Sequence, residues 1–199
     1  WQGRGCGCHN DRTPKWFWRG DYEQGVKDRA YRELYVRWLE LGTFLPMFRS
    51  HGTDTPREIW NFGEEGTPFY DAIAKFIRLR YRLMPYIYSL AGAVRLKNAT
   101  IMRSLFFDFG EDEKTYEIRD EFLFGKNILV CPVTEPMYYE AGDKEMEEAK
   151  KSRVCYLPAG ADWIDFWTGQ YFGGGQSVER RTPLDQIPLF VKAGSILPM

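Results

Sequence analysis

The most constraining feature of this 199-residue chain is an apolar run that ends abruptly in polar side chains. Residues 42–47 read Gly-Thr-Phe-Leu-Pro-Met, and residues 48–53 read Phe-Arg-Ser-His-Gly-Thr. A core strand that delivers polar side chains into a pocket has this pattern, and barrel sites are built at such strand ends. We therefore predict a short buried strand over residues 43–48, with a pocket beyond it.

Helical patterns flank this predicted strand on both sides. Over residues 28–41 the apolar side chains recur at helical spacing, and Gly42 stands where a C-terminal glycine cap is expected. Over residues 69–97 a second pattern of period 3.6 predicts a long helix that Pro85 should kink. A helix before and after one short strand is typical of a βα step in a parallel sheet or barrel.

The pattern changes after Asn98, where short apolar runs separated by Gly, Pro and Asp turns replace the helical periods. This spacing predicts an antiparallel β-sandwich, so we place a domain boundary near Asn98. The charged stretch at 140–152 is expected to be a solvated loop or a short helix. The predicted strands are residues 102–109, 127–133, 153–157, 163–167 and 195–199.

Composition narrows the classes of function. Hydrophobic residues make up 44% and charged residues 28%, which is ordinary for a soluble globular protein. The net charge of -1 favours neither a nucleic-acid nor a membrane partner, and no apolar run approaches membrane-spanning length. The chain begins at Trp1 without a signal-peptide pattern, so we expect a cut inside a longer protein and leave localisation open.

The four cysteines lie in two settings. Cys6 and Cys8 are spaced more tightly than the usual zinc pair, and no second pair follows, so no metal site is predicted. Cys131 and Cys155 lie in apolar, strand-like runs and are expected to be small buried residues. The motifs of phosphoryl transfer, serine hydrolysis and zinc proteolysis do not occur, and no cofactor is expected.

Three residues are candidates for binding a sugar. His51 could orient a substrate hydroxyl, and the alternative is a buried histidine that the backbone satisfies. Arg49 could clamp an acid or a sugar oxygen, with a structural ion pair as the alternative. Trp60 could stack on a sugar ring, or it could be a core aromatic that anchors its loop. We predict no catalytic residue here, because acids such as Asp21 are better explained as helix caps.

A set of short motifs extends along the chain from about Trp16 onward. They are Tyr35-x-x-Trp38 and residues 42–52, 80–88, 102–103, 124–125, 129–133, 156–158, 163–169 and 193–198. Together these motifs resemble glycoside hydrolase family 31, the α-glucosidase and α-xylosidase family. The resemblance implies an α/β plus all-β fold, with the last βα steps of a (β/α)8 barrel followed by an antiparallel β-sandwich domain. Residues 1–97 would be the C-terminal part of the barrel, and residues 98–199 the proximal C-terminal sandwich.

The resemblance also carries expectations about function. It matches His51 to the family's substrate-binding histidine at the mouth of a late barrel strand. The family hydrolyses α-glycosides with retention and without a metal, using two carboxylates in motifs that precede this region. The chain would then be a fragment that acts on α-xylosides or α-glucosides, with a carbohydrate substrate and the upstream part of its own catalytic domain as partners. A non-catalytic carbohydrate-binding or scaffold module and a helical interaction protein are the alternatives.

Overall fold

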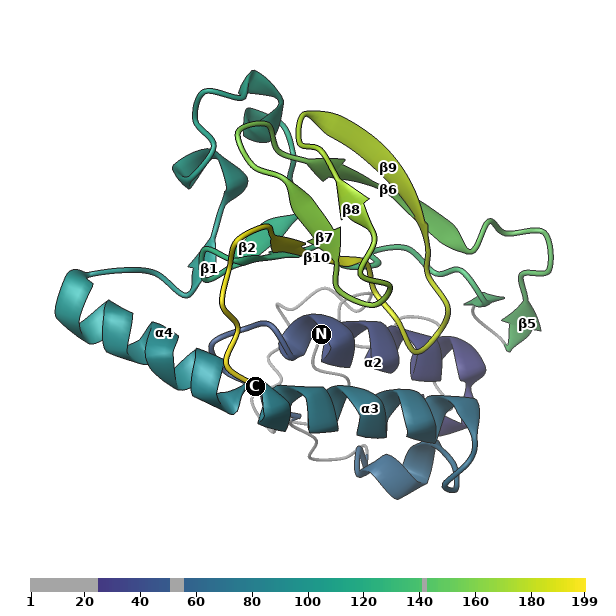
Figure 1. Ribbon diagram of the computed structural model, residues 1–199. Coiled ribbons are helices and arrows are strands. Elements are labelled where there is room, and N and C mark those ends of the chain that lie inside the picture. The colour runs from purple at the N-terminus through teal and green to yellow at the C-terminus, as the bar shows by residue number, and fades with distance from the viewer. Residues whose placement is uncertain (1–24, 51–55, 141–142) are drawn as a thin grey trace, which may run out of the picture.

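The chain forms three layers in a computed structural model that describes residues 25–50, 56–140 and 143–199. Helices form one outer layer, a six-stranded antiparallel sheet forms the middle layer, and a strand pair covers the far face of that sheet (Figure 1). The helices are α2 (Arg29–Gly42), α3 (Pro68–Arg82) and α4 (Met84–Lys97), with short 3-10 turns η1 (Gly25–Lys27), η2 (Ile59–Phe62), η3 (Leu105–Phe107) and η4 (Glu113–Tyr116).

The first predicted helix is confirmed, but its end differs from the prediction. Asp28 caps α2 at its start, and its carboxylate accepts the N–H of Ala30 at 2.8 Å. Gly42 is the last helical residue and not a left-handed cap, because Thr43 continues in the right-handed region. The glycine is needed for packing instead, since a Cβ there would lie 3.3 Å from the ring of Phe48.

The long second helix breaks where the proline predicts. α3 ends at Arg82, and α4 begins at Met84 with Pro85 in its first turn. Proline lacks an N–H and its ring displaces the carbonyl four residues earlier, so the helix cannot continue straight. α4 then ends at Asn98, which adopts the left-handed region with φ of 50°. Within the described ranges, no helix has the length and apolar character to cross a bilayer.

The strand predicted over residues 43–48 is wrong. These residues form a turn and then an extended segment, in which the N–H of Phe44 donates to Leu41 and that of Leu45 to Gly42. A strand needs a neighbour that pairs with its backbone groups. No such neighbour lies beside this segment among the described residues, so the backbone closes local turns.

The antiparallel β-sandwich predicted for the second half is confirmed. Its main sheet has the order β1-β2-β3-β10-β7-β8, and β6 pairs with β9 in the facing layer. The strands are β1 (Met102–Arg103), β2 (Phe122–Phe124), β3 (Ile128–Val130), β4 (Tyr139–Glu140), β5 (Lys144–Glu145), β6 (Ser152–Leu157), β7 (Trp163–Asp165), β8 (Tyr171–Phe172), β9 (Gln176–Arg181) and β10 (Leu189–Lys192).

Several strand predictions need correction. Residues 105–107 form the 3-10 turn η3, residues 195–199 form no strand, and the stretch at 140–152 contributes to the β4–β5 hairpin. β9 was not predicted, because its side chains are polar and largely exposed. Its backbone nevertheless pairs along the whole length of β6, which supplies the apolar residues.

Side chains of the main sheet alternate between two cores. Phe124, Ile128 and Leu189 face the helices, where they pack against α3 and α4. Leu123 and Leu129 face the opposite way and pack against β6. This alternation follows from the two-residue period of a strand and explains why one sheet supports both outer layers.

Charged side chains of α2 attach the helical layer to the sandwich. The Glu33 carboxylate accepts the backbone N–H groups of residues 137, 138 and 139 at 2.9–3.0 Å. The Arg37 guanidinium donates to the carbonyls of Thr182 and Pro183 at 3.0 Å, and to Glu40 at 3.0 Å. Burial raises the pKa of Glu40 to about 8, although Arg37 opposes the shift. We call Glu33, Arg37 and Glu40 the α2 junction.

Candidate functional site

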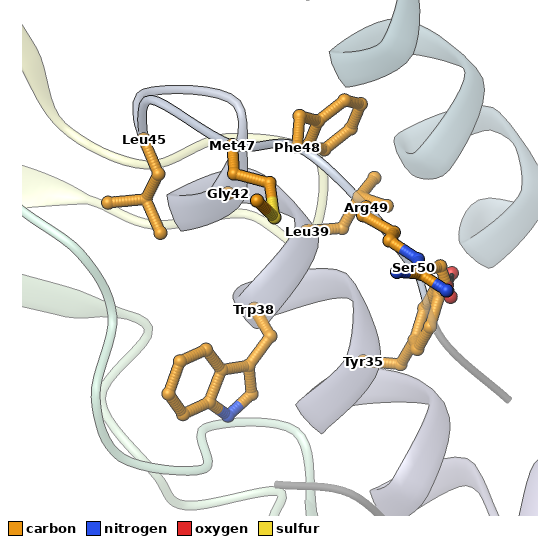
Figure 2. A pocket seen from close by; sticks show the side chains of 9 residues that line it. All are labelled: Tyr35, Trp38, Leu39, Gly42, Leu45, Met47, Phe48, Arg49 and Ser50. Carbon is orange, nitrogen blue, oxygen red and sulfur yellow. Dashed lines mark hydrogen bonds between the residues drawn. The ribbon is translucent and has the colours of Figure 1, made fainter.

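A small cavity lies where the segment after α2 folds back along the helix. Figure 2 shows residues 47–50 running beside α2, with Trp38 and Tyr35 projecting from the helix. The cavity has a volume of about 170 Å³ and a mostly apolar lining. The residues that line it are Tyr35, Trp38, Leu39, Gly42, Leu45, Met47, Phe48, Arg49 and Ser50.

Arg80 of α3 fixes the turn at residues 43–46, which lies beside this cavity. Its guanidinium donates to the carbonyls of Thr43 at 2.8 Å, Leu45 at 2.6 Å and Pro46 at 3.1 Å. The group lies 5.7 Å from the centre of the Phe48 ring. Burial lowers the pKa of Arg80, but hydrogen bonds from a charged donor are strong. These three hydrogen bonds therefore satisfy backbone carbonyls of the turn that pairing with a neighbouring strand would otherwise satisfy.

Tyr35 anchors the loop at the other end of the cavity. Its hydroxyl donates to the Ser50 hydroxyl at 2.8 Å and lies 3.3 Å from the carbonyl of Arg57. Its ring stacks on Phe62 with 4.2 Å between centroids. Burial raises the pKa of Tyr35, so the phenol remains a donor at neutral pH. The chain on both sides of residues 51–55 is thus tied to the same side chain of α2.

The structure separates the three predicted sugar-binding residues. Arg49 is exposed, lines the cavity and has no ion-pair partner among the described residues. Trp60 lies in η2 with 70% of its surface exposed and does not line the cavity, so it is no core aromatic. Phe62, two residues later, occupies the core instead. His51 lies outside the described residues.

The described lining of the cavity contains no carboxylate. Retaining glycoside hydrolysis needs two carboxylates about 5 Å apart on either side of the scissile bond. An exposed guanidinium beside aromatic and apolar side chains can bind a polyol by hydrogen bonding and stacking. As described, this cavity has the chemistry of a binding surface and lacks a general acid or nucleophile.

Comparisons with known proteins match nearly the whole chain to one family. Residues 14–90 match the glycosyl hydrolases family 31 TIM-barrel domain, and residues 98–197 match the glycosyl hydrolase family 31 C-terminal domain. The chain belongs to glycoside hydrolase family 31. The resemblance drawn from the motifs is therefore confirmed, as is a fold that joins the end of a TIM barrel to a C-terminal sandwich domain.

Relatives of this family-31 chain are considerably longer. An α-xylosidase of Saccharolobus solfataricus is 42% identical over 180 residues, which cover 90% of this chain and 23% of the relative. α-Glucosidase 2 of Bacillus thermoamyloliquefaciens is 38% identical, with 88% of this chain and 20% of the relative covered. A family-31 α-xylosidase structure from Xanthomonas citri shares 48% identity and a TM-score of 0.74, covering 84% of this chain and 17% of its own. The chain thus spans about a fifth of the length of these proteins.

Sequence analysis of this family-31 chain missed the two residues that hold the site together. Arg80 lies in the motif at residues 80–88, but its role was not predicted, although it follows Ile73 and Phe76 on the buried face of α3. A cation at a position where the helical period expects an apolar residue signals a buried partner. Tyr35 gave no comparable signal, because its partners Ser50 and Arg57 lie 15 and 22 residues away.

Proposed function

We propose that this chain is a fragment of a retaining α-glycoside hydrolase that acts on α-xylosides or α-glucosides of oligo- or polysaccharides. Family-31 membership across both matched segments is the observation that carries the proposal. Proteins named α-xylosidase at 42% and 48% identity favour an α-xyloside as the substrate. In this mechanism one carboxylate attacks the anomeric carbon while a second acts first as acid and then as base.

We assign substrate contacts to His51, Arg49 and Trp60. Arg49 reaches the rim of the cavity, where its five N–H donors can bind sugar hydroxyls. The exposed indole of Trp60 offers a stacking surface. His51 directly follows Ser50, whose hydroxyl is fixed by Tyr35.

The upstream part of the same catalytic barrel is the proposed partner. It would supply both carboxylates and cover the apolar side chains exposed around the helices, such as Met47, Tyr88 and Leu96. We place the division between barrel and sandwich at Asn98, where α4 ends. We expect the isolated chain to self-associate through these apolar side chains. A monomeric mass in light scattering, together with a sharp cooperative thermal melt, would contradict this part of the proposal.

Two activity measurements test the proposal. The purified 199-residue chain should release no chromophore from an aryl α-xyloside or α-glucoside. Turnover by this chain would overturn the upstream placement of the carboxylates. In the full-length protein, Trp60→Ala should raise KM about two- to tenfold, because an aromatic contact contributes roughly 0.5–1.5 kcal/mol. Trp60→Phe keeps a stacking ring and should retain most of the affinity.

One surface feature favours the alternative of a carbohydrate-binding sandwich module. Phe106, Phe107 and Tyr116 form an exposed aromatic group on η3 and η4, with the rings of Phe106 and Tyr116 stacked at 6.0 Å. On this alternative the isolated chain binds xylan or glucan, and Phe107→Ala abolishes that binding while Trp60→Ala does not. The leading proposal expects no such binding by the isolated chain.

A further inference from the structure

A second polar cluster lies between the two sheets of the sandwich, away from the candidate sugar site. The ligand atoms of Glu121, Cys131 and Cys155 all lie within 4.8 Å of one another. The strands explain this meeting: Phe122 pairs with Val130, so the preceding Glu121 and the following Cys131 project from neighbouring strands toward β6. Cys155 projects from β6 to meet them, so the cluster spans both sheets.

The three side chains are enclosed, and one of their atoms is unsatisfied. Both cysteines have no exposed surface, both are free thiols, and Glu121 is 7% exposed. Oε1 of Glu121 accepts the N–H of Tyr156 at 2.9 Å and a guanidinium N–H of Arg153 at 3.3 Å. Oε2 makes no hydrogen bond of normal geometry among the described residues, and the thiol of Cys131 lies beside the carboxylate. A buried carboxylate oxygen without a partner is costly, so it requires an explanation.

We propose that Glu121, Cys131 and Cys155 bind a thiophilic divalent cation of the zinc class. Tetrahedral zinc with Zn–S of about 2.3 Å and Zn–O of about 2.0–2.2 Å holds its ligand atoms about 3.4–3.8 Å apart. The cluster brings a carboxylate oxygen and both sulfurs within 4.8 Å of one another, near these separations, and Oε2 of Glu121 lacks a partner among the described residues that an ion would supply. Two sulfur ligands select zinc, cadmium or cobalt over magnesium and calcium, and water completes a site of three protein ligands.

Arg153 makes this site electrically neutral. Binding transfers the two thiol protons to solvent, and the cation exchanges water ligands for two thiolates and one carboxylate. The cation and the Arg153 guanidinium together cancel those three negative charges. Arg153 also binds Asp120 at 2.9 Å and the carbonyl of Pro132, so its position is fixed from both sheets. The bound ion would join β3 to β6 and stabilise the sandwich.

Cadmium titration of the full chain tests the site. The background is Cys6→Ser with Cys8→Ser, because those thiols are the other possible sulfur ligands in the sequence. After reduction and chelation, Cd²⁺ should give a thiolate charge-transfer absorption that saturates at one ion per chain, together with a higher Tm. The ¹¹³Cd shift of the same sample should report two sulfur ligands, and this measurement needs no variant inside the core.

Variants locate the site. Cys131→Ala with Cys155→Ala should abolish the absorption, and Glu121→Gln should weaken binding by more than Arg153→Met. The Arg153 variant should lose roughly 10- to 100-fold, as removal of an outer-shell partner does. Glu179→Gln, an exposed carboxylate on β9, is the matched control and should bind normally. An absent absorption, a cadmium shift without sulfur ligands, unchanged binding by Glu121→Gln, or a Cys131–Cys155 disulfide in the purified chain would overturn the proposal.

Discussion

The helical layer and the β6–β9 pair cover opposite faces of the same sheet, and a different set of buried groups attaches each of them. α2 is attached by charged side chains, because Glu33 binds three backbone N–H groups and Arg37 binds carbonyls more than 140 residues away. β6 is attached by apolar contacts around Leu129 and Trp163, and also by the Arg153 guanidinium, which donates to the Pro132 carbonyl, and the Tyr156 N–H, which donates to Glu121. Hydrogen bonds are directional and hydrophobic burial is not. Both outer layers therefore combine apolar packing with directional bonds from buried charged groups, and those of α2 reach further along the sequence.

This difference bears on the candidate site. α2 carries Tyr35 and Trp38, which line the cavity beside Arg49. A shift of α2 against the sandwich would move both residues relative to any barrel that carries the catalytic acids. On the proposed function, the α2 junction therefore orients the surface that we assign to substrate binding.

The largest expected effect is that of Arg37→Met. The change removes a buried guanidinium donor from three carbonyls of residues 182–186 and removes the cation beside the buried Glu33 and Glu40 side chains. Breaking a buried pair in this way costs about 3–5 kcal/mol. Urea unfolding monitored by circular dichroism measures this loss in the free energy of unfolding. A loss below about 1 kcal/mol would show that the junction is not what holds the helices to the sandwich.

Leu129→Ala should lower the free energy of unfolding by about 3 kcal/mol. This variant tests the packing on the other face of the sheet. Leu129 is fully buried between the sheets, and its removal leaves a cavity that rigid strands cannot fill. Because no charge is involved, the loss should be the same at pH 5 and pH 8. A loss that changed with pH would show that the packing of Leu129 is coupled to a titrating group.

Glu40→Gln should remove a pH dependence that the α2 junction imposes. Burial raises the pKa of Glu40 to about 8 from an unfolded value of 4.5. The folded state therefore holds a proton that the unfolded state loses, and stability falls as pH rises from 4.5 toward 8. Between pH 5 and pH 7 the loss for the parent should exceed that for the variant by about 2 kcal/mol, because other titrating groups such as Glu121 contribute equally to both. Parallel pH profiles of the two proteins would contradict this.

The smallest change in the free energy of unfolding is expected for Arg29→Ala, at the N-terminal end of α2. Arg29 pairs with Asp143 at 2.7 Å and also with Glu145, but all three side chains are substantially exposed. Exposed ion pairs are screened by water and salt, so the change should stay within the error of the unfolding measurement. A loss of unfolding free energy comparable to that of Arg37→Met would show that α2 is attached mainly through the β4–β5 hairpin.

The sequence predicted those parts of the fold that local patterns specify. The period of apolar residues located α2, and Pro85 located the break between α3 and α4. The strand prediction over residues 43–48 was wrong because the composition is that of a strand, whereas strand formation requires a pairing partner. β9 was missed because its polar sequence relies on β6 for pairing.

The candidate site was predictable only in part. The motif around residues 42–52 indicated the family and pointed to Arg49, which the structure places at the cavity. It gave no sign that Arg80 and Tyr35 hold the surrounding chain, because those bonds form only after α3 packs against α2.

The sequence by itself determined the helices, the antiparallel character of the second half and the membership in family 31, since each depends on patterns within a short window. Only the tertiary structure decided how the buried charges are satisfied. Arg37 finds its carbonyl partners about 145 residues away, and Glu121 meets two cysteines from two different sheets. A buried charge must find a partner wherever packing brings one, and no local pattern records where that is.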